Sequence, residues 1–364
     1  MSNLTEEIQK INDSPAIPTP PSPDEIAKYQ SMLDERRFDH ANPPLKPDPH
    51  LTINGNILAT RGNLMNIQAA AKAGKSAVVG AILSSIMDDS GLTDCFGFEA
   101  KNTDEKAVLH FDTEQSRYDA HWLIARSLER ANIISPPTWL YSYSMADLGI
   151  PERIAAIEIA IKDAEEACGG VFAIFIDGVA DLLNDPNDAE SSFDLIGHLH
   201  RLAIVKDCVI ITVLHENPSS DSGKTRGHLG SQLERKAETN LRLSKCKDGV
   251  TTIFADRSRH CFIPKSNGSC FEWNDDLQMH TSSGDRAKRL SDAKIDQARS
   301  DAEIALAGKR LKHKKLTEFI MSFMALKERA AKQRISLWRK LGIVNVDDKA
   351  NYYLIDDNPT QSVQ

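Results

Sequence analysis

The sequence predicts an α/β protein whose core is a twisted, mostly parallel β-sheet with helices on both faces. Short, fully apolar segments alternate with longer amphipathic ones, as expected for strands that are buried on both sides. A glycine- and lysine-containing loop sequence follows the first of these strands, and a later strand ends in aspartate. Strands that alternate with helices in this way pair in parallel, because each helix carries the chain back across the sheet.

Five apolar segments are the expected strands of this core, and four amphipathic segments are the expected helices. The strands are Leu64–Gln68, Ala107–Asp112, Trp139–Tyr143, Val171–Asp177 and Cys208–Leu214. The helices are Ser76–Asp88, Ser116–Asn132, Pro151–Cys168 and Ala189–Lys206. Residues 239–245 and 250–256 alternate with period two, which predicts an antiparallel hairpin at the edge of the sheet.

Composition divides the chain into four parts. Residues 1–24 are polar and proline-rich, and we expect a disordered tail. Residues 25–283 contain the α/β core, which is preceded by a short helix and a strand pair around Asn54-Gly55. Residues 284–308 are charged and are expected to be a helical linker. Residues 309–357 form the last predicted domain.

The last domain has the order of a small winged helix-turn-helix: two helices followed by a two-stranded tip. Its second helix would present Lys332, Arg334 and Arg339 to nucleic acid. Between Arg286 and Lys340 there are 16 Lys and Arg against 6 Asp and Glu, so a chain of net charge −8 carries a local +10. A helical hairpin used for subunit contacts is the alternative.

Composition also argues against a membrane-spanning, secreted or disulfide-rich protein. No apolar run approaches the roughly 20 residues of a membrane span, and the first ten residues lack the order of a signal peptide. The six cysteines form no C-x-x-C pair, so neither a zinc site nor a disulfide framework is expected. We therefore expect a cytoplasmic protein.

The loop after the first core strand, residues 69–76 (AAAKAGKS), matches the phosphate-binding motif G-x-x-x-x-G-K-[ST] except that Ala69 replaces the first glycine. Backbone N–H groups of such a loop surround the phosphates, the lysine reaches the β- and γ-phosphates, and the hydroxyl binds Mg²⁺. The predicted nucleotide-binding residues are Ala71, Lys72, Ala73, Gly74, Lys75, Ser76 and Ala77.

The strand Val171–Asp177 places a carboxylate at its end, about a hundred residues after the loop. An aspartate in this position can hold Mg²⁺ opposite the hydroxyl of the loop. Ser76 and Asp177 are therefore the predicted metal-binding residues, and ATP with Mg²⁺ is the predicted cofactor.

With these elements in this order, the segment from Leu51 to Pro264 resembles RecA-like P-loop ATPases. Within them it is similar to the hexameric helicase–ATPases of plasmids and other mobile elements, a RepA-like group. The stretches D-T-E-Q-S, H-E-N-P and R-G-H-L-G carry the closer resemblance. It implies that Glu114 is the general base, with Asp112 as the competing choice, and that His215 senses the γ-phosphate.

The resemblance also implies contacts outside the nucleotide site. A mobile loop from Pro218 would line a channel for single-stranded DNA, with Lys224 and Arg226 as contacts. In the D-R-S-R stretch, Arg259 would enter the site of a neighbouring subunit as a catalytic finger. A solvated loop and a surface basic pair are the alternatives.

The expected function is that of an ATP-hydrolysing, DNA-dependent motor, a hexameric helicase active in replication of a mobile element. Two alternatives stay open: a recombination mediator that does not translocate, and an ATP-gated DNA-binding regulator or loader. DNA and other copies of the same chain are the expected partners, and no membrane is involved.

Overall fold

The computed structural model describes residues 22–216, 227–247, 249–283 and 285–355, with side chains outside 285–293. The chain forms two compact units, residues 1–46 and 47–364. The first contains helix α2 (Pro23–Arg36), which has no buried residue. The helix begins two residues inside the predicted tail, because Ser22 and Glu25 form a capping box and proline suits the first helical position.

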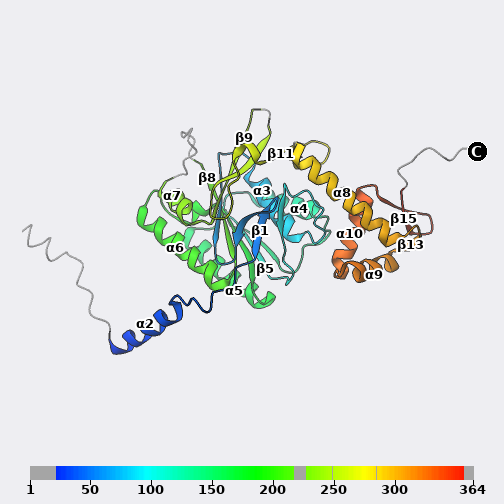
Figure 1. Cartoon of the computed structure of the whole chain (residues 1–364). Helices are drawn as coiled ribbons and strands as arrows, with labels where there is room; N and C mark the ends of the chain where they lie inside the picture. The colour runs from blue at the N-terminus through cyan, green and yellow to red at the C-terminus, as the bar shows by residue number, and fades with distance from the viewer. Residues whose placement is uncertain (1–21, 217–226, 248, 284, 356–364) are drawn as a thin grey trace, which may run out of the picture. The chain divides into compact units, whose positions relative to one another are not determined.

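A nine-stranded sheet is the centre of the second unit, in the order β12-β11-β10-β9-β3-β8-β7-β5-β6 (Figure 1). Its parallel strands are β3 (Leu64–Ala69), β5 (Ala107–Asp112), β6 (Leu140–Ser144), β7 (Val171–Asp177), β8 (Val209–His215) and β9 (Thr239–Lys245). The antiparallel strands β10 (Thr251–Ser258), β11 (Ser269–Asn274) and β12 (Met279–Ser283) extend it. The predicted α/β class with a mostly parallel sheet is confirmed.

Helices cover both faces of this sheet, and successive residues of β7 show the division (Figure 1). Ala173 and Phe175 pack in one apolar cluster with α3 (Lys75–Met87) and α4 (Arg117–Arg130). Ile174 and Ile176 pack in a second cluster with helices of the other face. These are α5 (Ile150–Cys168), α6 (Ala189–Lys206) and α7 (Gly227–Lys236). Because each β7 side chain meets a helix layer, the strand contains no polar residue before Asp177.

A three-stranded sheet lies beside this core, in the order β2-β1-β4. It consists of β1 (Pro49–Ile53), β2 (Asn56–Thr60) and β4 (Phe98–Ala100). Buried Glu238 ties it to the amino end of the large sheet by accepting hydrogen bonds from the Thr60 N–H (2.7 Å) and hydroxyl (2.8 Å). The predicted β1–β2 pair is present, whereas β4 was not expected because it is only three residues long.

The C-terminal residues form a third apolar cluster around Trp338. Helices α8 (Asp285–Leu306), α9 (His313–Met324) and α10 (Glu328–Lys340) surround it, with a small sheet of β13 (Leu311–Lys312), β15 (Asn351–Leu354) and β14 (Val344–Val346). The two helices and two strands expected here are present. The end of α8 contributes Ala298, Ala302 and Ala305 to the same cluster, so the segment expected as a linker is partly core.

None of the helices within the described ranges is both long and apolar enough to cross a membrane.

Candidate functional site

The predicted site residues meet where β3, β5, β7 and β8 reach the carboxyl edge of the sheet. The parallel register sets Asp112 beside Asp177, and Ala69 beside His215. After β3 and β5 the chain enters α3 and α4 on one face, whereas after β7 and β8 it enters α6 and α7 on the other. In open α/β sheets, ligands bind outside the carboxyl ends of the strands where the chain diverges in this way, and we call this region the crevice.

The loop between β3 and α3 has the backbone that its sequence predicts. Ala69 is the last residue of β3 and needs no left-handed conformation, so alanine in place of glycine is tolerated. Gly74 caps α3 with φ +93° and offers no side chain to the first N–H groups of the helix. Those groups are thus left for an anion, which the helix dipole also favours. Ala71, Lys72 and Ser76 are exposed along this loop.

Gly74 packs against Phe271, a residue that the sequence analysis did not predict to lie near the loop. Phe271 of β11 is fully buried, and a Cβ atom at position 74 would lie 2.8 Å from its ring. Phe271 in turn stacks on Phe96, with ring centroids 4.5 Å apart. The alternating pattern of β11 could have indicated a strand, but nothing in the sequence connects that strand to the loop.

Three predicted catalytic side chains form one chain of contacts across the crevice. His215 at the end of β8 places Nδ1 2.9 Å from Lys75 Nζ, and its Nε2 lies 3.0 Å from a carboxylate oxygen of Glu114. The hydrogen bond with His215 lowers the pKa of Glu114, so the carboxylate is ionised at neutral pH. Burial lowers the pKa of Lys75, which Glu114 and Asp177 partly offset. The lysine is therefore a poorly hydrated cation facing two carboxylates.

Asp177 is 3% exposed, and its Oδ2 has no hydrogen-bond partner among the described residues. Burial raises its pKa to about 7, with smaller contributions from Asp112 and Glu114 and an opposing one from Lys75. A buried carboxylate oxygen without a donor fits a cation ligand. The residues present are therefore compatible with a divalent cation at Asp177.

Asp112, the alternative choice as general base, holds the turn that carries Glu114. Its carboxylate accepts hydrogen bonds from the N–H groups of Glu114 (3.0 Å) and Gln115 (2.8 Å), and from the Gln115 side chain (2.8 Å). These bonds occupy both carboxylate oxygens and orient the residue after next. Glu114, which is exposed at the mouth of the crevice, is the carboxylate with access to a ligand.

Arg259 is not part of this site within one chain. It follows β10 at the amino edge of the sheet, where its guanidinium donates to the Asn63 side chain (3.3 Å) and the Lys236 carbonyl (3.2 Å). Asn63 precedes β3, so about six residues of strand, roughly 20 Å, separate this edge from the loop at Ala69. Only a second copy could bring Arg259 to the crevice.

The predicted nucleic-acid contacts have different environments. Lys224 and Arg226 lie outside the described residues. Lys332 and Arg339 are exposed on α10, and Lys332 pairs with Glu328 at 2.7 Å. Arg334 forms a half-buried ion pair with Asp301 at 2.6 Å and donates to the Ser90 carbonyl, so its charge is used inside the protein.

No protein-family model matches the chain, and a search of curated proteins finds no match either.

Replacing Gly74 with alanine should destabilise the loop by about 1–3 kcal/mol, because the new methyl group meets both an unfavourable φ and the Phe271 ring. Gly55→Ala is the matched control, since Gly55 also has positive φ (+75°) but has no atom within 4 Å of its Cβ position. Thermal unfolding of both variants separates the cost of the unfavourable φ from the cost of the contact with Phe271. Equal losses would show that the contact with Phe271 is unimportant.

Asp177→Asn should stabilise the protein by on the order of 1–3 kcal/mol above about pH 8. The raised pKa means that the folded state holds this proton more tightly than the unfolded state. Stability from the carboxyl is therefore present at low pH and is lost as pH rises through about 7, whereas asparagine has no charge to bury. Chemical denaturation at several pH values tests this, with exposed Asp104→Asn as control. A gain that does not shrink toward pH 4 would contradict it.

Proposed function

We propose that the chain is a RecA-like P-loop ATPase that acts on DNA. The observation that carries the proposal is the contact chain Lys75–His215–Glu114, which joins the phosphate-binding motif to a base candidate at one sheet edge. The three residues lie at the start of α3, at the end of β8 and after β5, and are 140 and 101 positions apart in the pairs that touch. Such partners beside the loop motif support the proposal.

In this proposal the residues divide the work of γ-phosphate hydrolysis. The N–H groups from Gly74 to Ala77 bind the phosphates, and Lys75 leaves His215 to reach the β- and γ-phosphates. Bound Mg²⁺ supplies charge neutralisation, with Ser76 and Asp177 as the residues that would hold it. Glu114 accepts the proton of the attacking water, and its hydrogen bond to His215 keeps it ionised and in place.

The position of His215 supports its role as a γ-phosphate sensor. The side chain bridges lysine and glutamate, so a phosphate that attracts Lys75 changes what His215 contacts. Its strand leads directly to the segment at Pro218–Arg226, which carries Lys224 and Arg226 as proposed single-stranded DNA contacts. In this way, binding of a nucleotide in the site would alter the segment that contacts DNA.

The proposal includes an oligomer, a hexamer, in which Arg259 serves the site of a neighbouring subunit. The residue lies at the edge opposite the crevice, so it can neutralise a transferring phosphoryl group only in another subunit. Its present partners, an amide oxygen and a carbonyl, carry no formal charge and can be exchanged at little cost.

The C-terminal residues 309–357 are proposed as a winged helix-turn-helix domain that binds DNA through α10. The exposed charges of Lys332 and Arg339 favour this, as does the local excess of positive charge. These observations equally support the second candidate, an ATP-gated DNA-binding regulator or loader.

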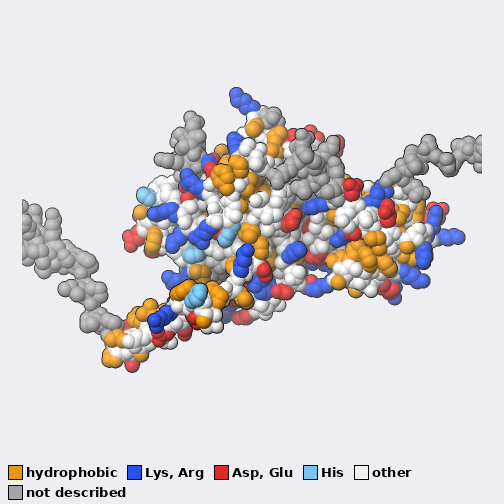
Figure 2. Space-filling model, viewed as in Figure 1, with side chains coloured by type: hydrophobic (Ala, Val, Ile, Leu, Met, Phe, Trp, Pro, Cys, Tyr) orange, Lys and Arg blue, Asp and Glu red, His pale blue; other side chains and the backbone are white. Residues whose placement is uncertain are grey.

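The alternative use of this domain, in subunit contacts, also has a supporting feature. Hydrophobic side chains gather on its surface (Figure 2). Among them Phe319 and Phe323 of α9 are 40% and 51% exposed and stack at 5.7 Å.

Lys75→Ala and Glu114→Gln should each lower ATP turnover at least about 100-fold, because one removes phosphate binding and the other the base. ATP hydrolysis is measured with and without single-stranded DNA, alongside ATP binding. Glu129→Gln, an exposed acid on α4, is the matched control. DNA-stimulated turnover that both variants abolish, with ATP still bound by Glu114→Gln, is the expected result. Binding without turnover under any condition would show that Glu114 is not the base and would favour a nucleotide-gated switch.

Lys332→Ala and Arg339→Ala should each weaken DNA binding and reduce its salt dependence by about one charge. Arg334→Ala should leave that salt dependence unchanged and instead lower the melting temperature, because it leaves Asp301 unpaired in a half-buried position. Fluorescence anisotropy across a range of salt concentrations measures the first effect. If Lys332→Ala and Arg339→Ala both bind DNA with wild-type affinity, α10 is not part of the DNA-binding surface. A defined footprint on one DNA sequence, without unwinding of a forked duplex, would favour the regulator.

A further inference from the structure

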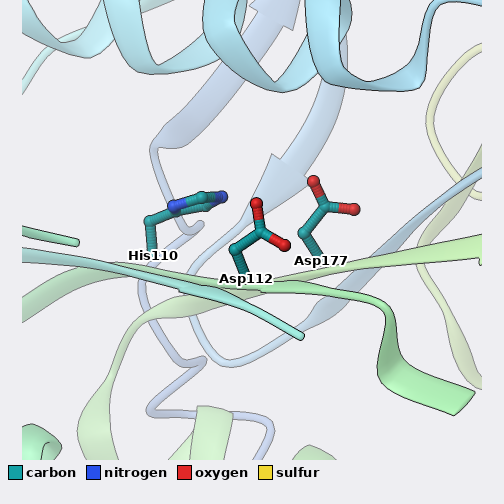
Figure 3. Close-up of side chains that lie close together, drawn as sticks. All are labelled: His110, Asp112 and Asp177. Carbon is teal, nitrogen blue, oxygen red and sulfur yellow. The ribbon is translucent and has the colours of Figure 1, made fainter. Parts of the chain in front are cut away.

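A compact group of three buried polar side chains lies at the ends of β5 and β7, namely His110, Asp112 and Asp177 (Figure 3). One ligand atom from each lies within 4.8 Å of the others. His110 and Asp112 are two residues apart on one strand and so project from the same face, and the register places Asp177 beside Asp112. His110 was not among the predicted site residues, because a histidine inside an apolar strand is ordinarily a core residue.

Two atoms of this group have no partner among the described residues: His110 Nε2 and Asp177 Oδ2. Both side chains are almost completely buried, at 0% and 3% exposure. The other ring nitrogen of His110, Nδ1, lies 3.0 Å from the Ser142 hydroxyl. In Figure 3 a ring nitrogen of His110 is turned toward the carboxylates of Asp112 and Asp177. Burial of two such atoms without a partner costs free energy that a shared ligand would recover.

The contact with the Ser142 hydroxyl is compatible with the tautomer that binds metals. If Nδ1 donates its proton to the Ser142 hydroxyl, Nε2 carries only a lone pair, which faces the carboxylates. The Nε2 lone pair and Asp177 Oδ2 then converge with no donor to either atom among the described residues. The Asp112 oxygens accept hydrogen bonds from the Glu114 turn and would reach a cation through their remaining lone pairs. A neutral imidazole with a free Nε2 lone pair is the form of histidine that binds a metal. Metal-binding histidines commonly have their second ring nitrogen held in this manner.

We propose that His110, Asp112 and Asp177 bind a divalent first-row transition-metal cation. One imidazole nitrogen and two carboxylate oxygens form a mixed set that favours Mn²⁺, Fe²⁺, Co²⁺ or Zn²⁺ over Mg²⁺, which prefers oxygen ligands. The cation would bring positive charge to two adjacent carboxylates, of which Asp177 alone is partly compensated by Lys75. It would also link β5 to β7 directly below the turn that carries Glu114.

The site shares Asp177 with the proposed ATPase but does not require a nucleotide, so the two ideas can fail separately. A cation held through Ser76 and Asp177 has only oxygen ligands, whereas the site proposed here includes a nitrogen. Detection of metal–nitrogen coupling therefore distinguishes them.

The test is titration of the nucleotide-free, full-length protein with Mn²⁺, followed by electron paramagnetic resonance. We expect one bound Mn²⁺ per chain, with an electron spin-echo signal from an imidazole nitrogen, and no displacement by equimolar Mg²⁺. Because this readout uses the wild-type protein, it does not depend on whether a variant folds. Absence of Mn²⁺ binding, or binding without nitrogen coupling, would overturn the proposal.

Variants locate the site. His110→Leu should weaken Mn²⁺ binding at least about tenfold and abolish the nitrogen signal. His121→Leu, which removes an exposed histidine of α4, should leave both unchanged. Lys75→Ala should retain Mn²⁺ binding while losing ATP, and loss of both would contradict an independent site. If His110→Leu does not fold, His110→Asn replaces it, since its shorter side chain keeps polarity but cannot reach the same point. Unchanged binding and coupling in a folded His110 variant would assign the metal elsewhere.

Discussion

The pairing of Asp112 with Asp177 across two adjacent parallel strands is the constraint on which the site depends. Two carboxylates are placed side by side at a buried edge, and burial raises the pKa of each. Burying these two carboxylates costs folding free energy, which the surrounding residues reduce. N–H groups of the Glu114 turn donate hydrogen bonds to Asp112, and the Lys75 ammonium lies near Asp177. The remaining need for positive charge makes the edge suitable for cations and for ligands that bring them.

The regular part of the fold could be predicted from the sequence, because it depends on local patterns. The five core strands and four core helices lie within two residues of their expected bounds. Apolar runs such as Val171–Ile176 can be buried on both faces only in a helix-covered parallel sheet, so pattern and topology agree. Lys75 was predicted from the loop motif. Asp177, Glu114 and His215 were also predicted from the sequence, because each lies at the end of a strand that the pattern identifies or within two residues of it.

Contacts between distant segments could not be predicted in this way. Phe271 lies in β11, a half-buried strand, and its contact with Gly74 depends on the final order of the sheet. His110 looks like any residue of a buried strand until the register places Asp177 nearby. The charge of Arg334 favoured a role at the surface, but its ion pair with Asp301 depends on how α8 packs against α10. Sequence reveals which side chains are available, whereas packing decides what they meet.

The contact between Gly74 and Phe271 has a consequence for how such a protein can evolve. A loop between a parallel strand and the next helix would ordinarily vary independently of antiparallel strands added to the sheet. Here the loop glycine packs directly against the aromatic ring, and a methyl carbon at position 74 would lie 2.8 Å from it, closer than van der Waals contact. A substitution at position 271 that changes the shape of the side chain would change the packing against the loop. A larger residue at position 74 would require a smaller one at position 271. Positions 74 and 271 should therefore change together among descendants of this chain. The antiparallel strands are thereby constrained by the loop, although they lie outside it in the sequence.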